Sequence, residues 1–479
     1  MRHFFSISNV FLIVGFLSVL FFSTYKLSEA PAIWYDEGFY TQMAKNFADT
    51  GKQVLQTEPG IYSSTSYVTV GYPLTATVGL SYKLFGSGVL QGRLIMALFL
   101  FGFVLASYFL FKKLFGKESA AWTVLLLATF PMLYGNGKAV LGEVPALFFL
   151  ILTLLALSQL ERNKYIGWHR YALVGLAAGL CLATKMFFVL LLIALFLTYL
   201  FNLRSIKLTW SGFIAGMIAL ICPLLLWAHI QFGAEATIQS VVSYYTNPYA
   251  VDNIPQHMLQ NAQRFITETT PSFTLVLTSI WGISLFFRRK IGGISAAETG
   301  GFIFCILVIL SYLRLEGWYR YLFPATMLSL LFLPNSLVLF YNFIGEKLSL
   351  PSYARLGVYA VLLLLAAGQL YQTSAISYVA QYYTGTRTHI MSEYLSSLSS
   401  ASVFLYNTPE LAIMLPTKNY YQYLTPLPEI TIGENSLVSL RNGVPDVVII
   451  ASEAYASNPN FIAYKPMQNI DRYTILQRK

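Results

Sequence analysis

Long apolar segments recur along this chain of 479 residues, and they constrain its fold more than any other feature. A helix needs about 20 mostly apolar residues to cross a bilayer. Only 11% of the residues are charged, against about 25% in soluble domains, which excludes an ordinary soluble enzyme, a disordered chain and a fibrous protein. We therefore predict a polytopic α-helical membrane protein with about eleven spans, at 6–24, 91–111, 119–135, 143–160, 171–184, 186–201, 210–229, 272–287, 299–315, 321–341 and 354–372.

The basic residues between these spans predict the orientation of the chain, because cytoplasmic loops carry an excess of lysine and arginine. With the N-terminus inside, every cytoplasmic loop is short and basic. The outward loop at 230–271, in contrast, has one basic residue, Arg264, and three acidic ones. An odd number of spans then places the C-terminus outside. The basic residues that support this orientation are Lys112, Lys113, Lys117, Arg162, Lys164, Arg170, Arg204, Lys207, Arg288, Arg289, Lys290 and Lys347.

Two outward segments are too long to be simple connections, the first loop at 25–90 and the tail at 373–479. The tail is more polar and holds no predicted span. We expect strands at 402–406 and 446–450, an edge strand at 473–476, and a short helix from Pro409 to Lys418 capped by Thr408. The predicted organisation is a membrane domain over 1–372 and a small soluble α/β domain over 373–479.

Apolar residues at helical spacing in the first outward loop predict two helices at the membrane surface. The first follows Trp34-Tyr35-Asp36-Glu37 and ends at Gly51. The second begins at Pro73, which suits a first helical turn, and ends at Gly86, which suits a C-terminal cap. Between them, the Ser/Thr/Tyr-rich stretch from Tyr62 to Thr69 is expected to complete the roof of a cavity.

The acidic pair Asp36 and Glu37 at the start of the first helix has two interpretations. In the first, Asp36 is the N-cap and both carboxylates stabilise the helix dipole. In the second, one carboxylate faces a cavity and accepts a proton from an acceptor hydroxyl. The sequence leaves both open.

Further polar residues lie at predicted outer membrane boundaries. Glu143 opens one span, and carboxylates at membrane depth are costly enough to suggest function. The cations Arg93, Lys185 and Arg320, the last followed by Tyr321, begin or separate other spans. Each cation alone is explained by its side chain reaching the headgroups. Three cations at the outer boundary run against the tendency of basic residues to lie on the cytoplasmic side. A phosphate carried by a lipid would explain their position, because these cations pair well with phosphate oxygens.

These motifs, in this order and on one membrane face, resemble the GT-C superfamily of polytopic glycosyltransferases over roughly residues 1–340. The resemblance is to the protein O-mannosyltransferase and lipid A aminoarabinose transferase group. The segments that carry it are Trp34-Tyr35-Asp36-Glu37, Pro73-Leu74 to Lys83-Leu84-Phe85-Gly86, Gly92-Arg93-Leu94, Gly142-Glu143-Val144-Pro145 with Leu147-Phe148-Phe149, Ala183-Thr184-Lys185, and Arg320-Tyr321-Leu322-Phe323-Pro324. One departure is Gly71-Tyr72-Pro73-Leu74, which lacks the basic residue and second proline that related enzymes often carry.

The resemblance implies an inverting transfer of a sugar from a polyprenyl-phosphate donor to an extracytoplasmic hydroxyl of a protein, lipid or glycan. It assigns Asp36 and Glu37 as catalytic residues, with Asp36 as the general base and Glu37 as its neighbour or positioner. The donor-phosphate candidates are then Arg93, Lys185, Arg320 and Tyr321, and the substrate-pocket candidates are Tyr35 and Glu143.

The leading hypothesis is therefore a multi-pass glycosyltransferase of the plasma (inner) membrane, with its active site and C-terminus outside the cytoplasm. No cofactor or nucleic acid is expected as a partner, and no metal site is indicated. A transporter of lipid-linked sugars or polysaccharides is the alternative, although it would favour charges near the middle of spans and paired repeats. A membrane scaffold whose outer cations bind anionic lipids is a third.

Overall fold

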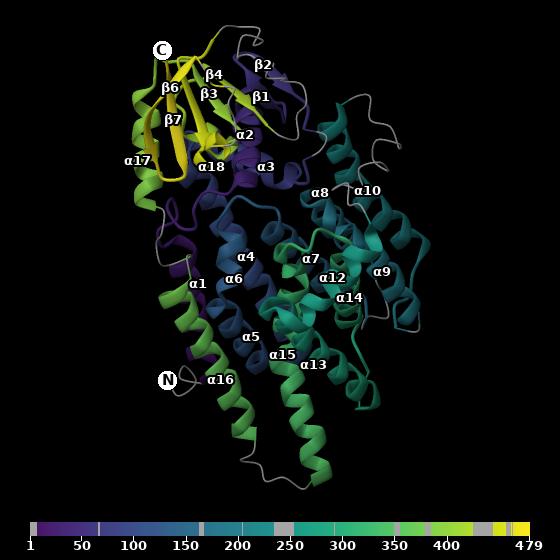
Figure 1. The fold of residues 1–479 in the computed structure, drawn as a ribbon. Helices are drawn as coiled ribbons and strands as arrows, with labels where there is room; N and C mark the ends of the chain where they lie inside the picture. Colours follow the sequence, from purple (N-terminus) through teal and green to yellow (C-terminus); the bar gives the residue numbers. More distant parts are fainter. Residues whose placement is uncertain are drawn as a thin grey trace, which may run out of the picture.

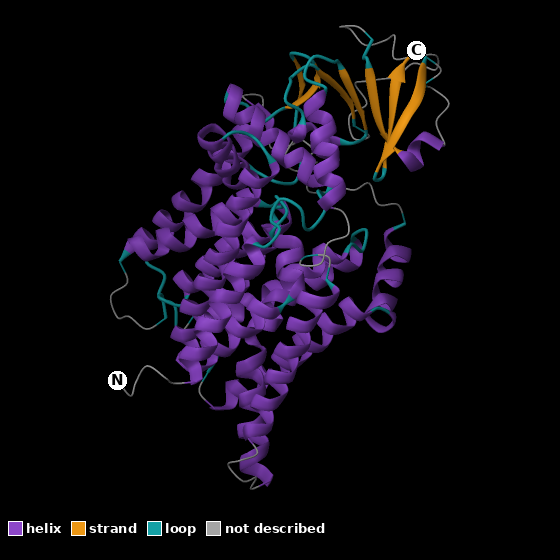
Figure 2. Cartoon of the chain, turned by 90° about the vertical axis from the view of Figure 1, so that its left-hand side faces the viewer, coloured by secondary structure: helices purple, strands orange, loops and turns teal. Residues whose placement is uncertain are grey.

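A bundle of helices and a sheet-containing domain at one end of it make up the molecule (Figure 1, Figure 2). The computed structural model describes residues 7–65, 68–161, 167–203, 205–233, 253–291, 293–348, 355–377, 379, 385–424, 444–456, 461 and 463–479. The predicted cytoplasmic residues Arg162, Lys164 and Arg204 therefore lie outside the described residues. The same is true of 234–252 in the predicted outward loop.

A helix coincides with each of the eleven predicted spans. Seven are long and apolar enough to cross a membrane. They lie within α1 (Ile7–Thr24), α4 (Val89–Phe115), α10 (Trp210–Phe232), α13 (Thr269–Ile291), α14 (Ala296–Arg314), α15 (Tyr319–Leu348), and α16 (Arg355–Tyr371) together with the helical segment η4 (Gln372–Ile376) that continues it. The other four are shorter helices of 12 to 17 residues, namely α5 (Lys117–Thr129), α7 (Glu143–Leu157), α8 (Trp168–Thr184) and α9 (Leu190–Phe201). The polytopic helical prediction is confirmed, with short helices packed among the long ones.

Hydroxyl groups join α13 to α15 inside the bundle. The side-chain oxygens of Thr274 and Thr326 lie 2.6 Å apart, those of Thr278 and Ser329 2.8 Å, and those of Ser284 and Ser336 2.9 Å. Small polar residues of this kind let helices approach closely in an apolar surrounding. They hold α15, whose first turn carries Arg320, in a fixed position.

The first outward loop contains the two predicted helices, α2 (Tyr35–Thr50) and α3 (Tyr72–Phe85). Gly51 ends α2 in the left-handed conformation with φ of 73°, as predicted. The N-cap of α2 is Trp34, so the interpretation of Asp36 as the N-cap is wrong. Glu37 takes over part of the capping, because its carboxylate accepts a hydrogen bond from the Trp34 amide at 3.3 Å.

Two features of this loop were not predicted. A short hairpin, β1 (Leu55–Glu58) and β2 (Ile61–Ser63), connects α2 to α3. Residues on both faces of α2 are buried, because α3 and the C-terminal domain cover it on different sides. An amphipathic helix lying at the membrane surface was predicted, and α2 is instead covered by other parts of the protein.

The C-terminal domain is the predicted α/β domain. Its five-stranded sheet has the order β4-β3-β5-β7-β6, with β3 (Val403–Tyr406) parallel to β4 (Tyr420–Tyr423) and to β5 (Val447–Ala451). The short helices are α17 (Gly385–Ser397), η5 (Pro409–Met414) and α18 (Ser452–Ala456). The helix η5 is a 3₁₀ segment, shorter than predicted, and the Thr408 side chain makes no capping hydrogen bond.

The assignment of 473–476 as an edge strand is wrong. β7 (Tyr473–Arg478) lies between β5 and β6 (Tyr464–Ile470), and β6 forms that edge. β6 escaped prediction because the residues between its ends are exposed and include Pro466. Exposed polar residues and proline are typical of an edge strand.

Candidate functional site

A cavity of about 1050 Å³ opens where the helical bundle meets the first outward loop. Its walls come from the α1–α2 connection, from α6 (Pro131–Gly137), from α12 (Ile254–Thr267) and from the connection into α15. Asp36, Tyr35, Arg320 and Arg264 are among its lining residues. None of the described residues from Tyr62 to Thr69 lines it, so the prediction that this stretch forms its roof is wrong.

An ion pair between Asp36 and Arg320 lies on the cavity wall. It joins the first turn of α2 to the first turn of α15, across 284 residues of sequence, through Arg320 Nη1 and Asp36 Oδ2. The side chains are only 23% and 18% exposed for Asp36 and Arg320. The Arg320 guanidinium also lies 4.5 Å from the centroid of the Trp318 ring, an arrangement that orients its plane. Its Nε makes no hydrogen bond within the described part of the chain.

Two further predicted site residues flank this pair. Tyr35 lines the cavity, and its hydroxyl donates to Asn407 Oδ1 of the C-terminal domain at 2.6 Å. Tyr321 does not line the cavity. It is 2% exposed and stacks on Trp318 with ring centroids 5.8 Å apart, so it supports the aromatic ring beneath Arg320.

Glu37 and Arg93 form a second ion pair, behind the cavity wall. Arg93 Nε and Nη2 donate to the two Glu37 oxygens at 2.8 and 2.7 Å, and both side chains are at most 1% exposed. Arg93 Nη1 donates to the carbonyls of Leu27 and Pro31 at 3.0 and 2.8 Å, and the amide of Val140 donates to Glu37 at 3.1 Å. Neither side chain lines the cavity. The pair ties the α1–α2 connection to α4 and to the segment before α7.

Glu143 and Lys185 form a third pair, and neither residue is among those that line the cavity. Lys185 Nζ lies 3.1 Å from Glu143 Oε1 and 5.6 Å from the centroid of the Tyr40 ring. The two side chains are 3% and 4% exposed. Lys185 lies at the turn between α8 and the next helical segment, as predicted, because its backbone leaves the helix to bridge Val70. Burial and the neighbouring Asp36 carboxylate raise the pKa of Tyr40, which keeps its hydroxyl protonated.

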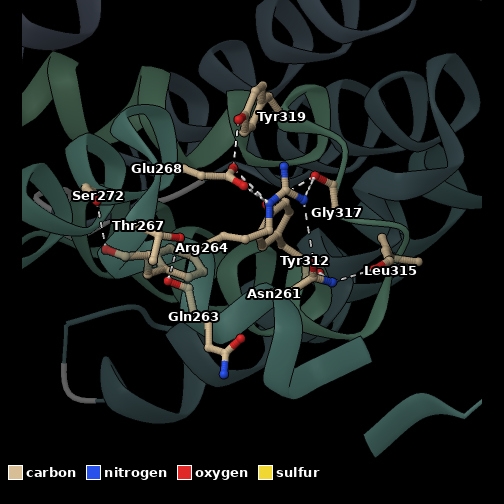
Figure 3. Close-up of polar contacts among 11 residues, drawn as sticks. Asn261, Gln263, Arg264, Thr267, Glu268, Ser272, Tyr312, Leu315, Gly317 and Tyr319 are labelled. Atoms are coloured by element: carbon tan, nitrogen blue, oxygen red, sulfur yellow. Dashed lines mark hydrogen bonds and ion pairs between the residues drawn. The ribbon is translucent and has the colours of Figure 1, made fainter. Parts of the chain in front are cut away.

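Arg264 belongs to the cavity but was not predicted as a site residue. Its Nε donates to both oxygens of Glu268, at 2.9 and 2.8 Å, and its Nη1 donates to the Gly317 carbonyl (Figure 3). The Tyr319 hydroxyl donates to Glu268 at 2.7 Å. The hydrogen bond from Tyr319 and the Arg264 charge lower the pKa of Glu268 and keep it ionised. The i,i+4 spacing of Arg264 and Glu268 was the signal in the sequence, and the assignment of 230–271 as a loop concealed it.

Among the described residues, no three or more histidine, cysteine or acidic side chains form a group that could hold a metal ion.

Comparisons with known proteins agree with the fold and with the family resemblance. Residues 74–227 match the model of the dolichyl-phosphate-mannose-protein mannosyltransferase family. The crystal structure of ArnT from Cupriavidus metallidurans bound to undecaprenyl phosphate aligns with a TM-score of 0.64 at 14% identity, over 98% of this chain and 97% of that one. No curated protein sequence matches this chain significantly.

Two larger glycosyltransferases share part of this fold. AglB, the oligosaccharyltransferase of Archaeoglobus fulgidus, was solved with an inhibitory peptide and a dolichol-phosphate. It aligns with a TM-score of 0.53 at 12% identity, over 88% of this chain and 64% of that one. The mycobacterial arabinofuranosyltransferase AftD aligns with a TM-score of 0.50 at 14% identity, over 87% of this chain and 31% of that one. The predicted resemblance to the GT-C superfamily is confirmed, and the chain has the GT-C fold.

Proposed function

We propose that this protein is a membrane glycosyltransferase that moves a sugar from a polyprenyl-phosphate donor to a hydroxyl acceptor outside the cytoplasm. The observation that carries the proposal is the Asp36–Arg320 pair on the wall of a large cavity. One member is a carboxylate that can accept a proton, and the other is a cation that can bind a phosphate oxygen. The fold supports the proposal, since the ArnT structure holds undecaprenyl phosphate and the AglB complex holds a dolichol-phosphate.

The proposed reaction is a single displacement with inversion at the anomeric carbon. The acceptor oxygen forms the new bond to that carbon while the bond from carbon to phosphate oxygen breaks. Asp36 takes the acceptor proton, and the polyprenyl phosphate leaves with the electron pair of the broken bond. A positioned base of this kind contributes about 10²–10⁴-fold in rate.

Arg320 and Arg264 are the proposed ligands of the leaving phosphate. Both line the cavity, and they reach it from different elements, α15 and α12. The described hydrogen bond of Arg320 uses Nη1 for Asp36 and its Nε is buried, so Nη2 is the donor that we assign to the phosphate. The described hydrogen bonds of Arg264 use Nε and Nη1, which leaves Nη2 for an anion. Guanidinium groups bind phosphate oxygens with paired hydrogen bonds and are the preferred cations for this task.

The remaining predicted site residues take supporting roles in this proposal. Arg93 has its donors engaged by Glu37 and two carbonyls, so we assign the Glu37–Arg93 pair to holding the Asp36 segment and not to phosphate binding. The buried Glu143–Lys185 pair lies beside Tyr40, which is one helical turn after Asp36 on the same face of α2. We assign it to fixing α2 and to the electrostatic field around Asp36. Tyr35 is assigned to the substrate pocket.

The proposed location is the plasma (inner) membrane, with a cytoplasmic N-terminus and the cavity and C-terminus on the far side. Cysteine substituted for Lys83, which is exposed in α3, should react in intact cells with an impermeant maleimide. Cysteine substituted for Lys112, which is exposed in the last turn of α4, should react only after the cells are opened. The reverse pattern would overturn the orientation.

The activity is tested with purified protein and a panel of synthetic undecaprenyl-phosphate sugars, by measuring the release of undecaprenyl phosphate. Asp36→Asn should lower kcat by at least about 100-fold, because the base is lost. Binding of undecaprenyl phosphate by the same variant should stay within about twofold. Asp49→Asn is the matched control, since Asp49 lies at the other end of α2, 38% exposed, and pairs with Lys418 at 2.7 Å. Full transfer by Asp36→Asn would remove Asp36 as the base. A protein that moves these lipids between leaflets of vesicles without releasing undecaprenyl phosphate would instead be a transporter.

A further inference from the structure

The C-terminal domain makes direct contact with the backbone of the Asp36 segment. A Cβ atom added to Gly38, two residues after Asp36, would lie 2.3 Å from the Glu410 nitrogen and 2.5 Å from the Pro409 carbonyl carbon. Real Cβ atoms do not approach backbone that closely, so the contact requires glycine at this position. The start of η5 therefore rests on the first turn of α2.

A buried carboxylate organises this contact from the side of the C-terminal domain. Glu410 Oε1 accepts hydrogen bonds from Arg472 Nη2 at 2.8 Å and from the Tyr473 hydroxyl at 2.7 Å. Glu410 is 4% exposed. Arg472 Nη2 also lies 3.3 Å from the carbonyl oxygen of Ile33, to which it donates. Arg472, which Glu410 and Tyr473 hold in place, thus binds the chain on the N-terminal side of Asp36.

A separate contact anchors the same segment through a side chain. The Tyr35 hydroxyl donates to Asn407 Oδ1, and Asn407 sits in the left-handed conformation, with φ of 53°, directly after β3. The residues immediately before and shortly after Asp36 are therefore held by Asn407, Glu410 and Arg472, whereas the carboxylate itself faces the cavity.

The contact also extends along α2, away from the cavity. The amide of Gln42 in α2 pairs with that of Gln422 in β4, with nitrogen-to-oxygen distances of 3.2 and 2.8 Å. Gln56 of the hairpin donates to the carbonyls of Lys418 and Tyr420, both at 2.8 Å. These amides are buried, so the domain is docked by many directional bonds and not by a single contact.

The contact lies at the carboxyl end of β3, near the middle of the parallel part of the sheet. β3 is parallel to β4 on one side and to β5 on the other, and the chain that leaves β3 goes on to β4. In open α/β sheets, ligands bind in the crevice at the carboxyl ends of strands where the connections diverge. Here Asn407 and Glu410, which follow β3, meet the residues of the Asp36 segment at that position.

We propose that the C-terminal domain is a positioning element for the proposed active site, in which Glu410, Arg472 and Asn407 hold residues 33–38 and so set the placement of Asp36 beside Arg320. The proposal rests on the function proposed above. In this proposal the domain positions the general base Asp36, and it does not serve as an acceptor-binding domain or a lid. Glu410 is a positioning residue, because it acts on Asp36 through the backbone.

Gly38→Ala and Glu410→Gln test the proposal in the full-length protein. A displacement of a catalytic group by about 1 Å can cost about 100-fold in rate, so each variant should lower kcat by about 10- to 100-fold. The KM for an undecaprenyl-phosphate sugar and the Kd for undecaprenyl phosphate should change by less than about twofold, since the phosphate ligands are untouched. Arg472→Lys should retain more of kcat than Arg472→Ala, because it keeps a charge beside Glu410.

Each variant has a matched control. Gly368→Ala adds the same methyl group in α16, where nothing lies within 4 Å. Lys418→Ala removes a charge from the same domain contact at an exposed pair with Asp49, far from Asp36 along α2. Both controls should keep kcat. Hydrogen exchange read by mass spectrometry should show faster exchange of residues 33–42 in Gly38→Ala and Glu410→Gln only.

The outcomes separate this proposal from the proposed function. If Asp36→Asn loses transfer while Gly38→Ala and Glu410→Gln keep kcat and the exchange of residues 33–42, the positioning role is wrong and the transferase stands. If Asp36→Asn keeps transfer, the proposed base is wrong. In that case, unchanged hydrogen exchange of residues 33–42 in Glu410→Gln would show that the domain does not hold this segment. Faster exchange would show that it holds the segment for structural reasons alone.

Discussion

Asp36 and Glu37 are neighbours in the sequence, both pair with an arginine, and their surroundings differ. The Asp36–Arg320 pair lines a cavity, is about one-fifth exposed and leaves Arg320 Nε without a partner among the described residues. The Glu37–Arg93 pair is at most 1% exposed, and two carbonyls and two amides complete its hydrogen bonds. We therefore place the first pair in the proposed active site and treat the second as a structural tie. What distinguishes them is whether hydrogen-bonding capacity is left over.

The largest effect should follow from breaking the structural tie. Arg93→Met leaves the Glu37 charge buried without its partner, which typically costs about 3–5 kcal/mol. We expect a large loss of thermal stability in detergent, measured as a fall in Tm, together with poor accumulation of the protein. The double variant Glu37→Gln with Arg93→Met removes the uncompensated charge and should recover part of the loss. Equal stability of Arg93→Met and the native protein would contradict the structural assignment.

The second largest effect should come from Arg320, the cavity arginine that pairs with Asp36, and should appear in kcat and not in stability. Arg320→Ala removes a charge from the proposed transition state, for which losses of about 10²–10³ in kcat are typical. Its Tm should change little compared with Arg93→Met, because the Asp36–Arg320 pair is accessible to water. Arg320→Lys should recover only part of kcat, since an ammonium group cannot hold Asp36 and a phosphate in one plane. A variant that loses stability and keeps kcat would place Arg320 with the structural residues.

A smaller effect is expected at Arg264, the second arginine of the cavity. Hydrogen bonds to charged groups contribute about 1.5–3 kcal/mol, so Arg264→Ala should weaken the binding of undecaprenyl phosphate by about 10- to 100-fold. Glu268→Gln keeps the guanidinium and only loosens its position, and should have a smaller effect. Binding is measured by titration of the detergent-solubilised protein. An unchanged Kd in Arg264→Ala would leave Arg320 as the single proposed phosphate ligand of the cavity.

The smallest effect concerns the acid–arginine pair of the C-terminal domain, Glu410–Arg472, and is a dependence of thermal stability on pH. Burial raises the pKa of Glu410 above its ordinary 4.5, although Arg472 and Tyr473 oppose the shift. At a pH between its pKa in the unfolded protein and its higher pKa in the folded protein, Glu410 therefore binds more protons in the folded state. The stability from this group is full below pH of about 4.5 and is lost as the pH rises through the folded pKa. Glu410→Gln should flatten this part of the Tm profile, measured from pH 4 to pH 7, and an identical profile in the variant would exclude Glu410 as its source.

Local patterns in the sequence determined most of the secondary structure. Hydropathy located the long helices, proline and glycine marked the limits of α2 and α3, and short apolar runs identified β3 and β5. These features are decided by neighbours within a few residues, through helix spacing, caps and burial. Where the signal was diluted by polar residues, as in β6 and α12, the prediction failed.

The order of residues alone is thus enough to predict a polytopic helical protein with an acidic pair at the start of α2. Which of the two acids faces a cavity depends on how distant helices pack. Arg320 is 284 residues from Asp36 and Arg93 is 56 residues from Glu37, so no local pattern could assign the partners. The folding of the chain also places Glu410 against Gly38, although more than 300 residues separate them in the sequence. Pairing, burial and leftover hydrogen-bonding capacity depend on which distant segments pack together, and that is a property of the folded chain alone.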